Sequence, residues 1–397
     1  MIGVLGCMFV SQGMAAQTDS IAATHELKDV VVKATNGIKS KYRVDNADII
    51  GQGQLIRAAC CNLGESFVAN PSVDVSYSDA ATGAKQIKLL GLSGTYVQML
   101  TENVPNLRGA SLPYSLGYVP GPWMQSIQVS KGASSVKNGY ESTTGQINIE
   151  FLKPQGTDGL RANVYQDSEL KTEVNLDGSI HLTDRLSTST LLHFENRQTD
   201  HDGNDDSFMD MPKLRQYNVM HRWAYVSPRW ISQLMLRGLH DEREGGQSRK
   251  HADMASSEPL YSTSVRTNRY EMQWKNGFTL NADHNTSVAL MLHGSWHDAE
   301  NQFGQTRYDV TQKNGYAQLM FETDVTANHN ISVGASLNYD RYDERFNPLG
   351  TKPNPETSVT GETTPGLYAQ YTYKLSQKLT VMPAVRWDNT DRSARFF

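Results

Sequence analysis

An acidic segment, residues 200–210 (DHDGNDDSFMD), holds the densest group of oxygen ligands in this sequence. Carboxylate and amide oxygens at short spacing, from Asp200 to Asp210, are the donors that Ca²⁺ prefers. However, Gly203 is misplaced for an EF-hand, in which the glycine follows three alternating ligands. We therefore favour a solvated loop, with a Ca²⁺ site as the alternative. No intrinsic cofactor is predicted.

Methionine and histidine side chains suggest a second kind of metal contact. Met209 and Met211 flank Asp210 and could present soft thioethers to copper. His293 and His297 share one face of a predicted strand, but four residues of strand separate them by roughly 13 Å, too far for one ion. Direct metal coordination by these four residues is the less favoured interpretation.

The cysteines do not form a disulfide framework. Cys60 and Cys61 are adjacent, and Cys7 lies in an apolar leader. A buried pair of free thiols at a helix start is the favoured interpretation. A vicinal disulfide would be strained, and a thiol metal site lacks further cysteines to complete it.

Composition and missing motifs exclude several functions. There is no nucleophile elbow, phosphate loop, HExxH helix or paired-carboxylate constellation, so we do not expect an enzyme. A net charge of −5 over 397 residues gives no basic footprint for nucleic acid. Mean hydropathy is −0.52, and no run of about 18 apolar residues occurs. Membrane strands of alternating polarity remain compatible with these values.

Two alternating strands surround a glycine-rich segment. Ile127 and Val129 alternate with polar residues before Lys131, and Ile147 and Ile149 do so after Gly145. These runs predict a compact sheet element.

The pattern of residues 124–154 resembles the plug domain of TonB-dependent receptors. Lys131-Gly132, Gly139-Tyr140 and Gly145 stand where this family usually has Arg-Gly, Tyr-Gly and Gly-Gly. Glu102-Asn103-Val104-Pro105 stands where it usually has Asp-Gly-Val-Pro. The receptors that it resembles are those of the Bacteroidetes, often labelled cobalamin- or siderophore-receptor-like; an N-terminal carboxypeptidase-regulatory-like domain, frequent among them, is not seen here.

The resemblance gives the N-terminal segment a role. Residues 1–16 resemble a signal peptide, and 17–35 form an extension whose ELKDVVVKA run resembles a TonB box. Asp29, Val30, Val31 and Val32 would then pair with the sheet edge of the TonB partner by β-augmentation. An ordinary first strand is the alternative.

The resemblance also indicates where a ligand would bind. The plug apex of such receptors meets the cargo, and the segment 106–123 carries Arg108, Tyr114 and Tyr118 among glycines and prolines. These side chains suit a flat or chelated ligand. A contact between the plug and the barrel wall is the alternative.

After Pro154 the sequence predicts long alternating strands. Short turns are expected at 183–184, 227–228, 281–283, 326–328 and 376–377, and long polar loops at 198–212, 243–262 and 346–365. This alternation of connection lengths is typical of outer-membrane barrels, with the short turns periplasmic.

Together these features predict an α+β plug domain (36–154) followed by an antiparallel transmembrane β-barrel (155–397). About eleven strands are counted, against 22 in the family, so we expect a truncated barrel. The resemblance implies active import of a scarce metal chelate or cofactor, such as a ferric siderophore or cobalamin, across the outer membrane. The implied partners are the TonB-ExbB-ExbD complex, outer-membrane lipid and the chelate. The alternatives are a passive porin or adhesin, and a glycan-importing receptor.

Overall fold

The computed structural model describes most of the chain beyond residue 46. The predicted signal peptide and TonB-box segment, residues 1–35, lie outside the described residues. The described ranges are 47–57, 61–68, 70–132, 135–156, 159–248, 259–348, 355–376 and 379–396.

The N-terminal domain, residues 47–154, is built on two small sheets. The larger has the order β1-β7-β8-β5-β6, and the smaller has the order β2-β3-β4. Only the β5–β8 pair is parallel. The strands are β1 (Ala47–Gly51), β2 (Val73–Asp79), β3 (Ala84–Leu89), β4 (Leu92–Ser93), β5 (Val97–Thr101), β6 (Val104–Pro105), β7 (Met124–Lys131) and β8 (Gly145–Phe151). This confirms the strands predicted from the glycine-bounded apolar runs.

Helical structure in the described part of this domain is short. One α-helix, α1, spans Gln52–Arg57. Five 3-10 helices span Leu63–Phe67, Gly94–Tyr96, Gly109–Tyr114, Gly121–Trp123 and Val136–Asn138. The domain is therefore mostly β, with less helix than the predicted α+β class suggests.

The main apolar core is centred in this domain and extends to the neighbouring sheet through Leu191, Met220 and Met235. Ile127 and Val129 of β7, and Ile147 and Ile149 of β8, are fully buried, so the predicted alternation does place these side chains inside. Trp123 is also fully buried and stands under the Arg237 guanidinium, 5.8 Å from it. Burial of such side chains stabilises by about 1.5–3 kcal/mol each.

A large antiparallel sheet forms a curved wall. From β9 to β18 its strands follow the chain order, each paired with the next, and the three short last strands all pair with β18. They are β9 (Gly159–Gln166), β10 (Thr172–His181), β11 (Leu186–Arg197), β12 (Lys213–Val226), β13 (Trp230–Gly246), β14 (Ser262–Asn281), β15 (Thr286–Phe303), β16 (Thr306–Thr326), β17 (His329–Asn347), β18 (Glu356–Lys374), β19 (Thr380–Val381), β20 (Ala384–Asp388) and β21 (Asp391–Phe396).

The last three of these strands form one interrupted strand. β19, β20 and β21 all pair with β18, and their partners, such as Tyr373↔Val381, Gly366↔Asp388 and Ser358↔Phe396, keep one register throughout. One interruption faces Pro365, which lacks an N–H but whose carbonyl accepts a hydrogen bond from the Asn389 amide at 3.1 Å. Counted this way, the described wall has eleven strand positions, and it does not close into a barrel.

The connections alternate largely as predicted. Four predicted short turns occur, between β10 and β11, β12 and β13, β14 and β15, and β16 and β17, whereas the one predicted at 376–377 lies partly outside the described residues. The loop at 198–212 is also confirmed. The predicted loops at 243–262 and 346–365 include residues that belong to strands. β13 continues to Gly246, and β18 begins at Glu356. Glycine, proline and threonine in 356–366 look like loop residues, but cross-strand pairing with β17 holds them in a strand.

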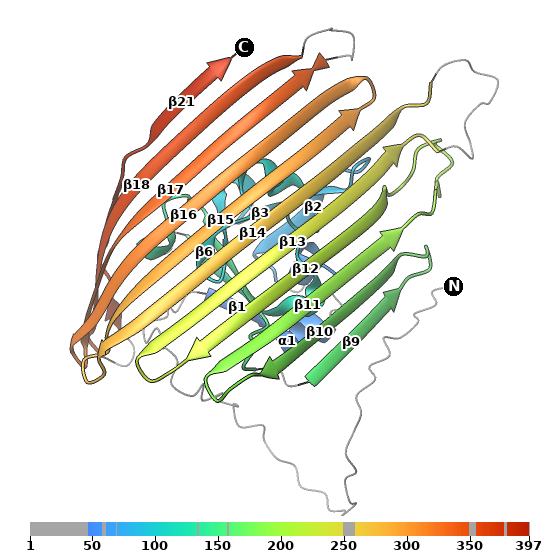
Figure 1. The fold of residues 1–397 in the computed structure, drawn as a ribbon. Helices are drawn as coiled ribbons and strands as arrows, with labels where there is room; N and C mark the ends of the chain where they lie inside the picture. Colours follow the sequence, from blue (N-terminus) through green and yellow to red (C-terminus); the bar gives the residue numbers. More distant parts are fainter. Residues whose placement is uncertain are drawn as a thin grey trace, which may run out of the picture.

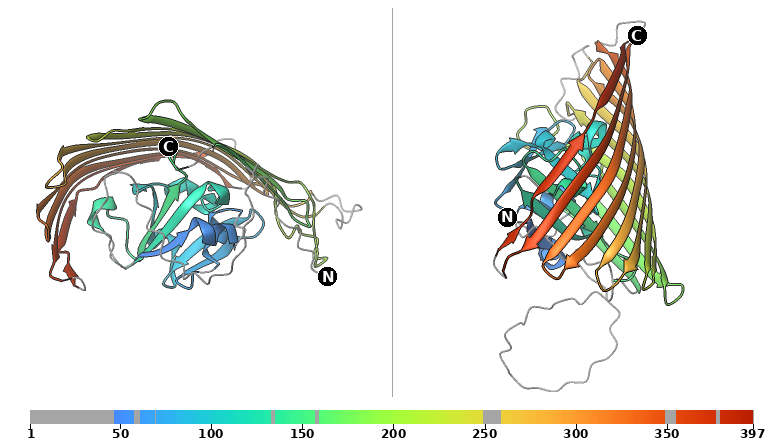
Figure 2. Two further views of the ribbon diagram at one scale, coloured as in Figure 1. Left: turned by 90° about the horizontal axis from the view of Figure 1, so that it is seen from below. Right: turned by 90° about the vertical axis from the view of Figure 1, so that its left-hand side faces the viewer.

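The wall wraps around the N-terminal domain. Its long strands run obliquely across Figure 1, with the domain behind them. Seen from below in Figure 2, the wall is an arc and the domain lies on its concave side. Along β17 the inner residues Ser332, Asn338 and Asp340 are buried, whereas the outer Val333 and Leu337 are exposed. No helix in the described ranges is long and apolar enough to span a membrane.

Candidate functional site

The contact between domain and wall is centred on Glu102. This residue and Asn103 form the β5–β6 turn, both with positive φ (52° and 67°), which is uncommon for residues other than glycine. The Glu102 side chain is 1 % exposed and pairs with Arg222 of β12 at 2.7 Å, with Lys275 of β14 at 2.8 Å, and with Lys153. Burial alone would raise the pKa of Glu102, but these three cations outweigh it and hold the pKa well below its usual range.

Other ion pairs join the same two bodies. Arg108 pairs with Asp340 of β17 at 2.7 Å and with Glu141 of its own domain. Lys137 pairs with Glu322 of β16 at 2.9 Å. The contact therefore extends from β12 to β17.

Wall side chains also bond to the domain's backbone. Arg222 donates to the Leu152 carbonyl at 3.0 Å, and Asn218 donates to the Tyr118 carbonyl at 2.8 Å. Arg237 donates to the Tyr118 carbonyl as well. Such polar contacts can be exchanged for contacts with water, so each contributes only about 1 kcal/mol net.

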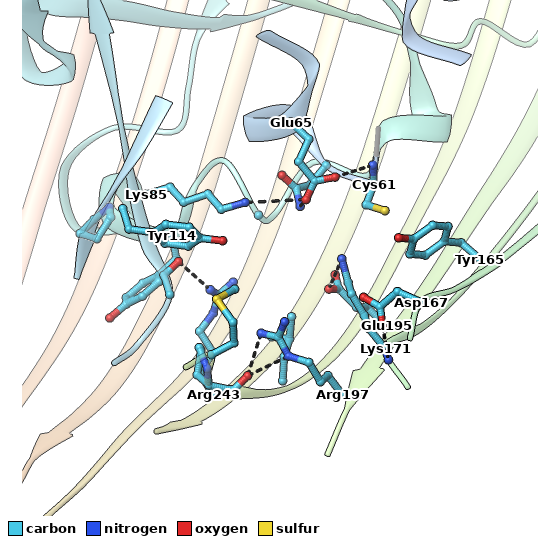
Figure 3. Close-up of a pocket in the computed structure, with 18 residues that line it drawn as sticks. Cys61, Glu65, Lys85, Tyr114, Tyr165, Asp167, Lys171, Glu195, Arg197 and Arg243 are labelled. Carbon is cyan, nitrogen blue, oxygen red and sulfur yellow. Dashed lines mark hydrogen bonds and ion pairs between the residues drawn. The ribbon is translucent and has the colours of Figure 1, made fainter. Parts of the chain in front are cut away.

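A cavity of about 250 Å³ opens where the domain meets the ends of β9–β13. This is the end of the wall that carries the long loops. Figure 3 shows charged and tyrosine side chains from the domain and from the wall surrounding it. Its lining comprises Cys61, Asn62, Glu65, Tyr77, Gly83, Lys85, Pro113, Tyr114, Gly117, Tyr165, Asp167, Lys171, Glu195, Arg197, Met211, Pro212, Leu214 and Arg243. We call it the external pocket.

Most charges in the external pocket are paired. Lys171 contacts Glu195 at 3.1 Å and Glu173, just behind the lining, at 2.6 Å. Arg243 pairs with Asp241 at 2.8 Å and stands 4.9 Å over the Tyr114 ring. Burial is the main reason that the pKa of Tyr114 lies above its usual range.

Cys61 borders the external pocket as a buried thiol that forms no disulfide. Its backbone amide donates to Glu65 at 2.9 Å, just before the 3-10 helix Leu63–Phe67. Burial raises the pKa of the thiol and so favours its neutral form. Cys61 is thus buried and outside any disulfide, as predicted, whereas Cys60 lies outside the described residues.

The structure does not bring the predicted apex residues together. Tyr114 lines the external pocket. Tyr118 is fully buried, with its hydroxyl 3.3 Å from Thr267 of β14, and Arg108 pairs with the wall. Tyr118 and Arg108 thus occupy the plug–wall position that was the alternative. The predicted TonB-coupling residues Asp29 and Val30–Val32 lie outside the described residues.

The residues predicted to contact a metal also lie in different places in the structure. Met211 lines the external pocket, while Met209 does not. His293 and His297 are buried on the inner face of β15, and the His297 ring lies 6.3 Å from the Tyr118 ring. No group of three or more His, Cys, Asp or Glu side chains among the described residues is arranged to hold a metal ion.

The acidic loop binds its own backbone. Asp202 accepts bonds from the Asp206 and Ser207 amides at 3.1 and 2.9 Å, and Asp210 accepts one from Gly203 at 2.9 Å. These carboxylates therefore already have partners without an ion, and the Ca²⁺ site stays a prediction.

Known proteins resemble this chain in a family pattern and in fold. Residues 227–397 match the family model described as TonB dependent receptor-like, beta-barrel. This part of the wall is therefore similar to the barrel of TonB-dependent receptors. No curated protein sequence matches. The matched family is one of receptors rather than of enzymes, in line with the prediction that this chain is not an enzyme, and similar solved structures are outer-membrane receptors, in line with the predicted location.

Solved structures of the same fold are distant in sequence. The alcaligin outer-membrane receptor of Bordetella pertussis superposes with a TM-score of 0.68 at 11% identity, over 88% of this chain and 56% of that one. The ferric yersiniabactin uptake receptor of Yersinia pestis gives 0.67 at 14%, over 88% and 57%. A copper transporter gives 0.70 at 11%, over 88% and 59%. The chain thus spans a little over half the length of the receptors it matches.

Proposed function

We propose that this chain is the plug and part of the barrel of an active importer of metal chelates across the outer membrane. In this proposal the N-terminal domain blocks the barrel, and a TonB protein pulls on the segment Asp29–Val32 to move the domain. The family match to residues 227–397 and the shared fold support it.

The observation that carries the proposal is the set of ion pairs in the domain–wall contact, which also includes apolar packing such as that of Val104 against Met291 and Tyr316. An apolar interface would have to be exposed to water when the domain moves, at about 25 cal/mol per Å². Here Glu102, Arg108 and Lys137 reach the wall through charged groups, which water can solvate once they part. Such a contact holds the domain in one position and still permits its displacement.

The coupling step uses the extended N-terminal segment. A β-branched run such as Val30–Val32 can add to a partner's sheet edge through backbone hydrogen bonds. Pulling along such a strand loads all of its bonds together. In the proposal the force passes through residues 33–46 to β1, which is the edge strand of the five-stranded sheet.

The cargo is proposed to be an iron chelate. The alcaligin and ferric yersiniabactin receptors share the fold, and the external pocket lies at the loop end of the wall. Cobalamin, and an origin in the Bacteroidetes, remain part of the proposal that rests on sequence resemblance alone.

The experiment is iron uptake by cells that carry the full-length protein with Val31→Pro. Proline removes a backbone N–H and prevents strand pairing, so uptake of radiolabelled ferric chelates should fall to the level of the deletion strain. Thr24→Pro, outside the ELKDVVVKA run, is the matched control and should leave uptake unchanged.

Two results would refute the proposal. Uptake that is unaffected by Val31→Pro would indicate a passive porin or adhesin. A deletion strain that takes up iron, cobalamin and copper normally but fails to grow on a glycan would indicate a glycan-importing receptor.

A further inference from the structure

Arg197 stands apart from the other charged residues of the external pocket. It is the last residue of β11, is 8 % exposed, and lines the cavity. Its Nε and Nη2 atoms both donate to the Pro212 carbonyl, at 3.1 and 2.8 Å. No carboxylate among the described residues lies within ion-pair distance of its guanidinium. A buried charge left without a counter-ion is costly, because neither water nor an anion compensates it fully.

The bond to Pro212 also fixes the direction of the guanidinium. The carbonyl occupies the edge formed by Nε and Nη2, so the end formed by Nη1 and the second Nη2 hydrogen is left open. That end presents two parallel donors at the spacing of a carboxylate's two oxygens.

The acidic residues of the pocket do not neutralise Arg197. Glu195 is held by Lys171, and Asp167 accepts bonds from the Glu169 and Lys171 amides at 2.9 and 3.0 Å. Figure 3 shows these acidic groups beside Lys171 on one side of the cavity. Across the cavity, Lys85 has a long ion pair, 3.7 Å, with the partly exposed Glu65, and its Nζ stands 5.3 Å from the centre of the Tyr77 ring.

We propose that the external pocket binds a carboxylate-bearing ligand, with the carboxylate on the open end of Arg197. This inference rests on the proposed import function, because it names the chemical class of the cargo. Lys85 supplies a second positive charge, and Tyr77, Tyr114 and Tyr165 provide ring surface and hydroxyl groups for the rest of the ligand. A cavity of about 250 Å³ accepts a small chelate of the hydroxycarboxylate type, or part of a larger one.

The experiment measures binding to the purified full-length protein in detergent by titration calorimetry. The probes are ferric citrate, citrate without iron, and a neutral ferric trihydroxamate. Wild type should bind ferric citrate, and Arg197→Gln should weaken that binding at least tenfold, as expected for loss of a charge-assisted bidentate contact. Arg197→Lys, which keeps the charge but loses the fork, should restore part of the affinity.

Arg215→Gln is the matched control. Arg215 is on β12 near the same end of the wall, but its side chain is 47 % exposed and outside the pocket, so its loss changes net charge equally and should not change affinity. Equal binding of citrate with and without iron would identify a free acid as the ligand. The inference is wrong if wild type binds neither citrate form more tightly than the neutral chelate, or if Arg197→Gln binds as wild type does.

These measurements need no TonB. Failure of binding with intact, Val31-dependent uptake would therefore overturn the carboxylate site alone. Binding that persists when uptake is independent of Val31 would overturn the import proposal alone.

Discussion

Glu102 is the residue on which the domain–wall contact depends most. Its carboxylate forms ion pairs with Arg222, Lys275 and Lys153, and it does so from a turn with positive φ. A glutamate in this conformation costs about 1 kcal/mol or more, which the surrounding ion pairs offset. The unusual turn residue seen in the sequence, glutamate in place of aspartate, thus has a structural reason.

Glu102→Gln should loosen the β5–β6 hairpin from the wall. Removing one partner of a buried ion pair costs about 3 kcal/mol, because the other charges remain buried. Amide hydrogen exchange across residues 97–105 should therefore accelerate roughly 100-fold. Glu150→Gln is the matched control, since Glu150 has one ion pair, to Lys153 at 3.0 Å, and is partly exposed. Equal exchange in the two variants would contradict the central role of Glu102.

The same carboxylate predicts the effect of acid. Its folded pKa lies below the unfolded value, so its stabilisation is fully present above about pH 5 and is lost as pH falls through the folded pKa. Exchange in residues 97–105 should accelerate as wild type is acidified below pH 5, and Glu102→Gln should show a weaker dependence. An acid response of equal size in the variant would assign it to other groups.

Sequence reasoning found part of the external pocket. Tyr114 and Met211 were both singled out, and both line it. Arg197 was missed. It stands an even number of residues from the inward-facing Ser187, Ser189 and His193 of β11, so the alternation of the strand places it on the same inner face. The pocket itself could not be predicted, because its lining joins segments from residue 61 to residue 243 that meet only in the folded chain.

At the scale of elements, one wall glycine permits the closest approach of the domain. A Cβ built on Gly245 of β13 would stand 1.8 Å from the Ala81 carbonyl, in the turn between β2 and β3. Thr263 donates to the same carbonyl at 3.4 Å, and Arg243 donates to Gly83 at 3.4 Å. The β2–β3 hairpin therefore rests directly on the wall's backbone.

Gly245→Ala should push this hairpin away from the wall. The hairpin carries Lys85 and Gly83 of the external pocket, so we expect faster amide exchange across residues 73–89 and weaker binding of ferric citrate. Gly294→Ala is the matched control, because its nearest neighbour would be the Asn314 carbonyl at 3.9 Å. The contact is unimportant if both alanine variants exchange alike.

Alternating polarity predicted the elements well and their ends less well. Strands such as β11, β15 and β17 have the inner and outer faces expected from sequence, since one side meets a polar domain and the other is apolar. β18 was partly assigned to a loop, because Gly361, Pro365 and Gly366 weaken the local strand signal. Pairing with β17 outweighs that local preference, and such tertiary support is not visible in a single sequence.

At the scale of the molecule, the wall and domain form two bodies with a charged contact. The wall has an apolar outer face and a polar inner face, which is the pattern of strands in a membrane barrel. The central claim is that transport requires the domain to move relative to the wall. Holding the two bodies together should therefore stop transport without altering either one.

The most direct test is uptake with the domain cross-linked to the wall. Lys137 and Glu322, an ion pair at 2.9 Å that lies outside the external pocket, are replaced by cysteines in a background with the native cysteines changed to serine, and joined by a reducible thiol-specific linker. The same linker across Arg215 and Glu242, both in the wall, is the control. We predict that the first cross-link abolishes uptake of a ferric chelate, that reduction restores it, and that the second has no effect. Unchanged uptake with the domain cross-linked to the wall would contradict the account.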